Sequence, residues 1–193
     1  MTSPEPLSGP RREQVLEAAV QVFGRYGFRK ASMDEVARAA QISRPGLYLY
    51  FPSKEALFRA AMQKELDTAF SEASAFLDDA EAEPLDRFVA ALDAWIGRYL
   101  GTSIGSDVGD LLEHSVAQLG SMFADYSARF EVRFAEAIAE AVPEPVVSPA
   151  DVAATLIATG NGWKHQVASR PEFVSKMTVA VDLFHAGLRK EAP

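Results

Sequence analysis

The 193-residue chain is 48% hydrophobic and lacks cysteine, so it can form one large or two small cored domains, and disulfides and thiolate metal sites are excluded. Its net charge of −8 is unevenly distributed: residues 1–54 hold eight basic and five acidic residues, a net charge of +3, and the remainder carries −11. Unless this clustering arose by chance, the basic segment suits phosphate contact, whereas the acidic remainder is repelled by nucleic acid.

The first predicted element is a helix over 12–26. Residues 1–10 are rich in Pro, Ser and Gly, which predicts a disordered arm, and they lack the apolar stretch of a secretory signal. Gly27 follows as a helix stop. One face of this helix is apolar: Val15, Leu16, Ala19, Val22, Phe23 and Tyr26.

A short second helix is predicted from Ser32, which forms a capping box with Glu35 three residues later. Its apolar positions recur at helical spacing: Met33, Val36, Ala37 and Ala40. A turn at Gln41-Ile42 separates it from a third helix.

The third helix is capped by Ser43, and Pro45 stands in its first turn, where a missing N–H costs nothing. Leu47 is expected to point inward. The remaining side chains are left to project: Arg44, Gly46, Tyr48 and Tyr50. Two short helices joined by a tight turn are typical of a DNA-binding helix-turn-helix.

The run from Arg12 to Met62 resembles the N-terminal domain of TetR-type transcriptional regulators. The matching motifs arrive in order: Phe23-Gly24-Arg25-Tyr26-Gly27-Phe28, Ala31-Ser32-Met33-Asp34-Glu35-Val36-Ala37, Ile42-Ser43-Arg44-Pro45-Gly46-Leu47-Tyr48-Leu49-Tyr50-Phe51 and Ser53-Lys54-Glu55-Ala56-Leu57. Gln41 departs from the family, which more often has Gly there. A left-handed backbone at this position costs a non-Gly residue about 1 kcal/mol.

The candidate base-reading residue is Arg44, because arginine grips guanine O6 and N7 in the major groove. Pro45 and Gly46 allow close approach of the helix. Arg11 and Arg12 fit either a DNA-contacting arm or a solvated tail. The full set of predicted DNA-contacting residues, several of them directed at phosphates, is Ser32, Ser43, Arg44, Pro45, Gly46, Tyr48, Tyr50 and Lys54.

The rest of the chain also predicts helices, with no alternation typical of strands. Ser148 is expected to cap the helix that begins at Pro149, and no apolar run is long enough to span a membrane. The predicted helices cover 53–79, a stretch after Pro84 that includes Trp95 and Tyr99, 107–118, 121–142, 148–169 and 171–190.

The last two helices are predicted to form a dimer interface, because the helix over 148–169 is apolar or small on two sides and both need burial. The resemblance implies the same, since TetR-type proteins dimerise through their last two helices. A helix buried centrally in a monomer is the alternative. The predicted interface residues are Ala153, Ile157, Gly160, Met177, Val181, Phe184 and Leu188.

The aromatic residues of these helices either pack as core or enclose a small-molecule pocket. The resemblance raises the second interpretation, because TetR-type bodies usually bind an inducer. We expect an effector that is mostly apolar. The candidate ligand-binding residues are Trp95, Tyr99, His114, Phe123, Tyr126, Phe130, Asn161 and Trp163.

The chain is predicted to be all-α and cytoplasmic, with an arm over 1–10, a helix-turn-helix domain over 11–54 and a dimerisation and effector domain over 55–193. The three scattered histidines form no catalytic set and no metal spacing, and no cofactor is expected. We expect a homodimeric repressor that a small effector releases from a pseudo-palindromic double-stranded DNA operator. The alternatives are a helical enzyme or small-molecule carrier, and a regulator or activator without an effector.

Overall fold

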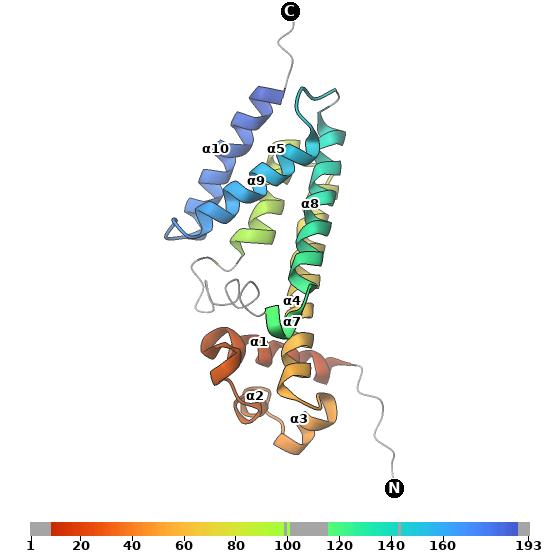
Figure 1. Cartoon of the computed structure of the whole chain (residues 1–193), viewed down its shortest axis with the longest axis vertical. Coiled ribbons are helices and arrows are strands. Elements are labelled where there is room, and N and C mark those ends of the chain that lie inside the picture. The colour runs from red at the N-terminus through yellow and green to blue at the C-terminus, as the bar shows by residue number, and fades with distance from the viewer. Residues whose placement is uncertain (1–8, 99, 101–115, 143, 189–193) are drawn as a thin grey trace, which may run out of the picture. The chain divides into compact units, whose positions relative to one another are not determined.

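The computed structural model describes residues 9–98, 100, 116–142 and 144–188, and their regular elements are all helical (Figure 1). The all-α expectation is confirmed for these residues. Among them, no helix has the length and apolarity needed to cross a membrane. The elements are α1 (Pro10–Lys30), α2 (Met33–Ala39), α3 (Arg44–Tyr50), α4 (Lys54–Asp78), α5 (Pro84–Leu92), the π-helical turn η1 (Asp93–Gly97), α7 (Val116–Leu119), α8 (Met122–Ala141), α9 (Pro149–Lys164) and α10 (Arg170–Leu188).

The chain forms two compact units. The first comprises the described residues within 1–66 and 103–123, and the second comprises those within 67–102 and 124–193. The first unit therefore contains α1, α2 and α3 with the beginning of α4, and it extends past Lys54, where the sequence interpretation placed the domain boundary.

The core of the first unit is built from the apolar faces that the sequence predicted. Phe23 of α1 and Phe58 of α4 are fully buried, and their rings meet edge to face at 5.0 Å. Phe28 lies 4.9 Å from Phe58 and completes an aromatic cluster. Tyr26 was expected on the buried face of α1 but is exposed. The cluster fixes α1 against α4 and so supports the two short helices.

Gly27 interrupts α1, as the sequence predicted. Its φ of 72° and ψ of 162° are not helical, and the chain continues as a short turn to Lys30. The left-handed φ suits glycine, which carries no Cβ. The break redirects the backbone toward Ser32, the N-cap residue of α2.

The second unit packs α10 against α5 and α9, with η1 contacting both α9 and α10. Gly97, at the end of η1, makes this close packing possible, because a Cβ there would lie 2.7 Å from a ring carbon of Phe173. Phe173 is itself fully buried. A helix continuous from Pro84 past Trp95 was expected, whereas the structure changes to π-helical geometry at Asp93.

Two predictions about helix ends differ from the structure. α9 ends at Lys164 and not at Ser169, because His165 closes it and Gln166 bonds back to Trp163. Ser148 occupies the N-cap position of α9, but its side chain makes no capping hydrogen bond. Most of the helix expected over 107–118 lies outside the described residues.

Candidate nucleic-acid interface

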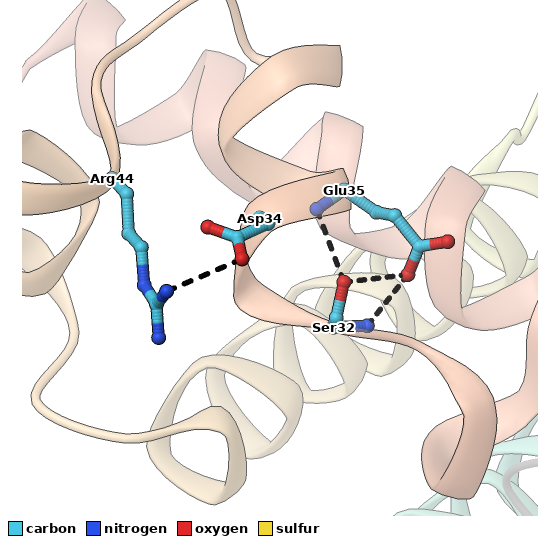
Figure 2. Close-up of polar contacts among 4 residues, drawn as sticks. All are labelled: Ser32, Asp34, Glu35 and Arg44. Carbon is cyan, nitrogen blue, oxygen red and sulfur yellow. Dashed lines mark hydrogen bonds and ion pairs between the residues drawn. The ribbon is translucent and has the colours of Figure 1, made fainter.

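The capping box predicted at the start of α2 is present (Figure 2). The Ser32 amide and hydroxyl donate to the Glu35 carboxylate at 2.8 and 2.7 Å, and the Glu35 amide donates to the Ser32 hydroxyl oxygen at 3.3 Å. Donation from Ser32 lowers the pKa of the Glu35 carboxyl below its ordinary value. These bonds fix the first turn of α2 and tie Glu35 back onto its own helix.

The turn between α2 and α3 has the left-handed backbone that the sequence predicted at Gln41, with a φ of 54°. The amide of Ile42 donates to the carbonyl of Ala37 at 3.0 Å, which closes the end of α2. The guanidinium of Arg11 donates to the Gln41 carbonyl at 3.2 Å. Arg11, for which the sequence left an arm or a tail open, is thus part of α1 and supports the turn.

α3 is held by one cap and one buried anchor. The Ser43 hydroxyl oxygen accepts a hydrogen bond from the Gly46 amide at 3.1 Å, and Leu47 is fully buried. A Cβ on Gly46 would lie 3.0 Å from the Ser43 hydroxyl oxygen. The absence of a side chain at Gly46 therefore keeps the cap tight as well as leaving the surface of α3 open.

The outward face of α3 carries Arg44, Pro45, Tyr48 and Leu49, all exposed, while Tyr50 is half-buried. The Arg44 guanidinium lies 5.8 Å from the centre of the Tyr48 ring. Hydrogen bonding to Tyr48 and the charge of Asp34 raise the pKa of Arg44. A short helix with its cation outward and its leucine buried fits the recognition element of a helix-turn-helix.

Lys54, which the sequence predicts to contact phosphate, is engaged by hydrogen bonds within the first unit. The ammonium donates to the carbonyls of Phe28, Ala31 and Arg29 at 2.9, 3.1 and 3.4 Å. It also lies 4.6 Å from the centre of the Phe28 ring. An ammonium has three donors, so Lys54 closes the segment between α1 and α2.

The Ser32 hydroxyl is not a free donor for phosphate either. A serine hydroxyl has one proton, and Ser32 gives it to Glu35. Ser43 differs, because its oxygen only accepts a hydrogen bond from Gly46 and its side chain is exposed. Ser43, Arg44, Pro45, Gly46, Tyr48 and Tyr50 therefore stay predicted DNA contacts, as do Lys54 and the N-terminus of α2 at Ser32, which no observation tests.

The candidate ligand-binding residues divide among several environments. Phe130 is fully buried, and its ring stacks on Trp95 at 5.0 Å and on Phe134 at 5.7 Å. These rings therefore form core, as the first interpretation of the aromatic residues held.

The other candidate ligand-binding residues are scattered. Asn161 is exposed, and Phe123 is half-buried in the first unit. Tyr99 and His114 lie outside the described residues. Trp163 is half-buried under the Lys176 ammonium, 4.9 Å from the ring centre.

A polar contact in the second unit was not predicted from the sequence. The Tyr126 hydroxyl donates to the carboxylate of Asp67, an exposed residue, in a part-buried hydrogen bond. Arg129 covers the Phe70 and Tyr126 rings at 4.4 and 4.9 Å. Burial, followed by the hydrogen bond to Asp67, raises the pKa of the Tyr126 phenol. The 59-residue separation of Tyr126 and Asp67 gave no local sequence signal.

Four of the predicted dimer-interface residues lie in the core of the chain itself. Ala153, Met177 and Val181 are 0, 0 and 2% exposed. Gly160 is also buried, and a Cβ there would lie 2.7 Å from Ile96 Cδ1. These residues have no surface to lose to a partner, so the interface prediction is wrong for them.

Other apolar positions of α9 and α10 do reach the surface. Val179 and Leu183 are 56% and 69% exposed and stand four residues apart, which puts them on one face of α10. Ile157 and Phe184 are half-buried. The side chain of Leu188 lies outside the described residues. The interface predicted from the sequence did not include this exposed pair on α10.

Residues 15–61 match the family model described as bacterial regulatory proteins, tetR family. The HTH-type transcriptional regulator RutR of Escherichia coli K12 is 35% identical over 69 residues, which cover 36% of this chain and 32% of RutR. The HTH-type transcriptional activator FasR of Mycolicibacterium smegmatis is 44% identical over 61 residues, 32% of this chain and 28% of FasR.

These sequence matches span about a third of each curated relative, whereas a structural match covers nearly the whole chain. A crystal structure of a TetR-like transcriptional regulator from Rhodococcus sp. RHA1 is 28% identical, with a TM-score of 0.68, and covers 95% of this chain and 100% of its own. The helix-turn-helix geometry and the family match agree that residues 15–61 are similar to the DNA-binding domain of TetR-family regulatory proteins, and the structural match shows a TetR-like fold over nearly the whole chain.

Proposed function

We propose that this chain is a homodimeric transcriptional regulator that binds duplex DNA through α3. The observation that carries the proposal is the exposed Arg44 on a short helix whose cap and buried Leu47 hold it rigidly. A rigid support matters because base recognition requires the guanidinium to meet guanine O6 and N7 together. Pro45 and Gly46 have small or no side chains, so the neighbouring surface of α3 does not block that approach.

Two considerations support dimerisation: paired helix-turn-helix domains read successive major grooves, and α10 exposes apolar residues. Two α3 helices in successive major grooves stand about 34–36 Å apart on a pseudo-palindromic site. Val179 and Leu183 supply apolar surface that a second copy would bury. Phosphate repels the acidic remainder of the chain, which favours DNA contact through the basic residues 1–54.

The experiment is selection of bound fragments from a random duplex pool, followed by fluorescence anisotropy with the selected DNA and with a random duplex. Arg44→Ala should abolish the preference for the selected DNA, with a loss of about 10- to 100-fold per half-site. Arg25→Ala is the matched control: it removes one exposed arginine of α1, on the same unit. It should weaken both duplexes alike. Equal discrimination by wild type and Arg44→Ala would reject Arg44 as the base reader.

We further propose that a small, mostly apolar effector binds the second unit and releases the DNA. The support is a part-buried polar contact, Tyr126 with Asp67, beside aromatic side chains that offer apolar area. A compound screen for lost DNA binding tests this, with Tyr126→Phe as the variant. Tyr126→Phe should change the response to the compound and shift the melting temperature little. A screen in which no compound alters DNA affinity would favour a regulator without an effector.

A further inference from the structure

The Arg44 side chain is already engaged before any DNA is present. Its Nη1 lies 3.3 Å from Oδ2 of Asp34, and the two side chains are 57% and 54% exposed. Asp34 is the second residue of α2 and Arg44 the first of α3, so the contact crosses the turn between the two helices. Figure 2 shows the guanidinium reaching toward Asp34, while Glu35 points to Ser32.

This contact uses only part of the Arg44 donor set. A guanidinium has five N–H groups in a planar fork, and the hydrogen bond recorded with Asp34 involves Nη1 alone. Donors remain for a bidentate grip on a guanine edge. A side chain that is held in place loses less conformational freedom when it binds. Asp34 on one side and the Tyr48 ring near the guanidinium together restrict where Arg44 points.

The same carboxylate disfavours DNA of any sequence. A negative charge beside the base-reading arginine stands close to where phosphates would lie, and it repels them whatever the bases are. Glu35, its neighbour in the first turn of α2, is instead tied back by two donors from Ser32. An aspartate that served only the helix dipole would not need to reach across to α3.

We infer that Asp34 is a specificity-determining residue, which positions the Arg44 guanidinium for a base pair and penalises sequence-independent binding through its charge. This inference rests on the proposed DNA-binding function. Asp34 is a positioning residue, because it acts on the bases only through Arg44. Its carboxylate therefore lowers affinity for random duplexes and raises the ratio of selected-site to random-site binding.

Asp34→Asn is the main variant, since it removes the charge and keeps the shape. Affinity for a random duplex should rise about 3- to 10-fold at low salt, while affinity for the DNA selected by the wild type stays equal or falls. Asp34→Glu, which keeps the charge, should bind random DNA with the low affinity of the wild type. Asp86→Asn is the matched control, because it makes the same change at an exposed aspartate in the first turn of α5. It should leave both affinities unchanged.

A double-mutant cycle separates positioning from simple charge. In an Arg44→Ala background, Asp34→Asn should still raise affinity for random DNA, but it should no longer change discrimination. The inference is overturned if Asp34→Asn leaves the selected-to-random ratio at its wild-type value, or if the ratio changes equally in both backgrounds. A wild type that binds no duplex at all would instead reject the proposed function, and the inference with it. Thermal melting of each variant confirms that the fold is retained.

Discussion

Replacing Lys54 with methionine tests the role that the structure gives this residue. Methionine keeps an unbranched apolar stem but removes the ammonium. The variant loses three hydrogen bonds, to the carbonyls of Phe28, Arg29 and Ala31, and the cation–π contact with Phe28. The affected segment is the one that leads from the break at Gly27 into α2.

The expected destabilisation is a few kcal/mol. A net hydrogen bond contributes about 1 kcal/mol, and an exposed cation–π contact contributes about 0.5–1 kcal/mol. The bond to Arg29 is exposed and the longest, at 3.4 Å, so it contributes least. Lys54→Met should therefore lower the free energy of unfolding by about 2–4 kcal/mol.

Urea denaturation followed by circular dichroism measures this change. Hydrogen exchange at the amides of residues 28–31 locates it. Lys64→Met is the matched control on the same helix, because the Lys64 ammonium pairs with Glu13 and Glu17, whose side chains are 54% and 67% exposed. Pairs of this kind contribute less than about 1 kcal/mol. The control should therefore unfold close to the wild type.

The opposite pattern would refute the structural role of Lys54. If Lys54→Met unfolds at the wild-type urea concentration, yet weakens binding to every duplex and flattens its salt dependence, the ammonium contacts phosphate. The structure predicts instead that the salt dependence of DNA binding stays unchanged wherever the variant is folded.

Four further outcomes are expected. Leu183→Asp should give a monomer by sedimentation without loss of fold, because Leu183 is 69% exposed; Val132→Asp, at a 60% exposed position of α8, should leave the oligomeric state unchanged. Gly97→Ala should cost about 1–3 kcal/mol in thermal unfolding, since its Cβ would lie 2.4 Å from Asp93 Oδ1; an unchanged melting temperature would reject the close packing at η1. Gln41→Gly should stabilise the fold by up to about 1 kcal/mol, because the φ of 54° suits glycine; a lower melting temperature would contradict this. Hydrogen bonds from Ser32 lower the pKa of Glu35 in the folded state below 4.5. The stabilisation of the fold by the ionised Glu35 is therefore present above pH 4.5 and is lost as the pH falls through the folded-state pKa, and Glu35→Gln should flatten this part of the stability–pH curve.

Most of the helix-turn-helix could be predicted from the sequence, because its signals are local. The capping box needs only Ser32 and Glu35, three residues apart, and the turn needs only the left-handed position at Gln41. The periodicity of the apolar residues places Leu47 inside and Arg44 outside. These features involve neighbours in the chain, so a linear pattern encodes them.

The dimer and ligand predictions fared worse because burial depends on distant partners. Helical periodicity cannot say whether an apolar face meets its own chain or a second copy. Met177 and Gly160 face the core of their own unit, whereas Leu183 is exposed. Likewise, the stacking of Trp95 on Phe130 joins residues far apart in sequence and makes core of rings that also suited a pocket.

The sequence by itself determined the helical class, the caps and the short helix that carries Arg44. The tertiary structure alone decided what each charged side chain does. Lys54, a predicted phosphate contact, donates hydrogen bonds to three carbonyls in the structure, and Asp34 lies against Arg44. The physical reason is that capping and periodicity are set by neighbours within about four residues. The partner of a long charged side chain is set instead by how the helices pack.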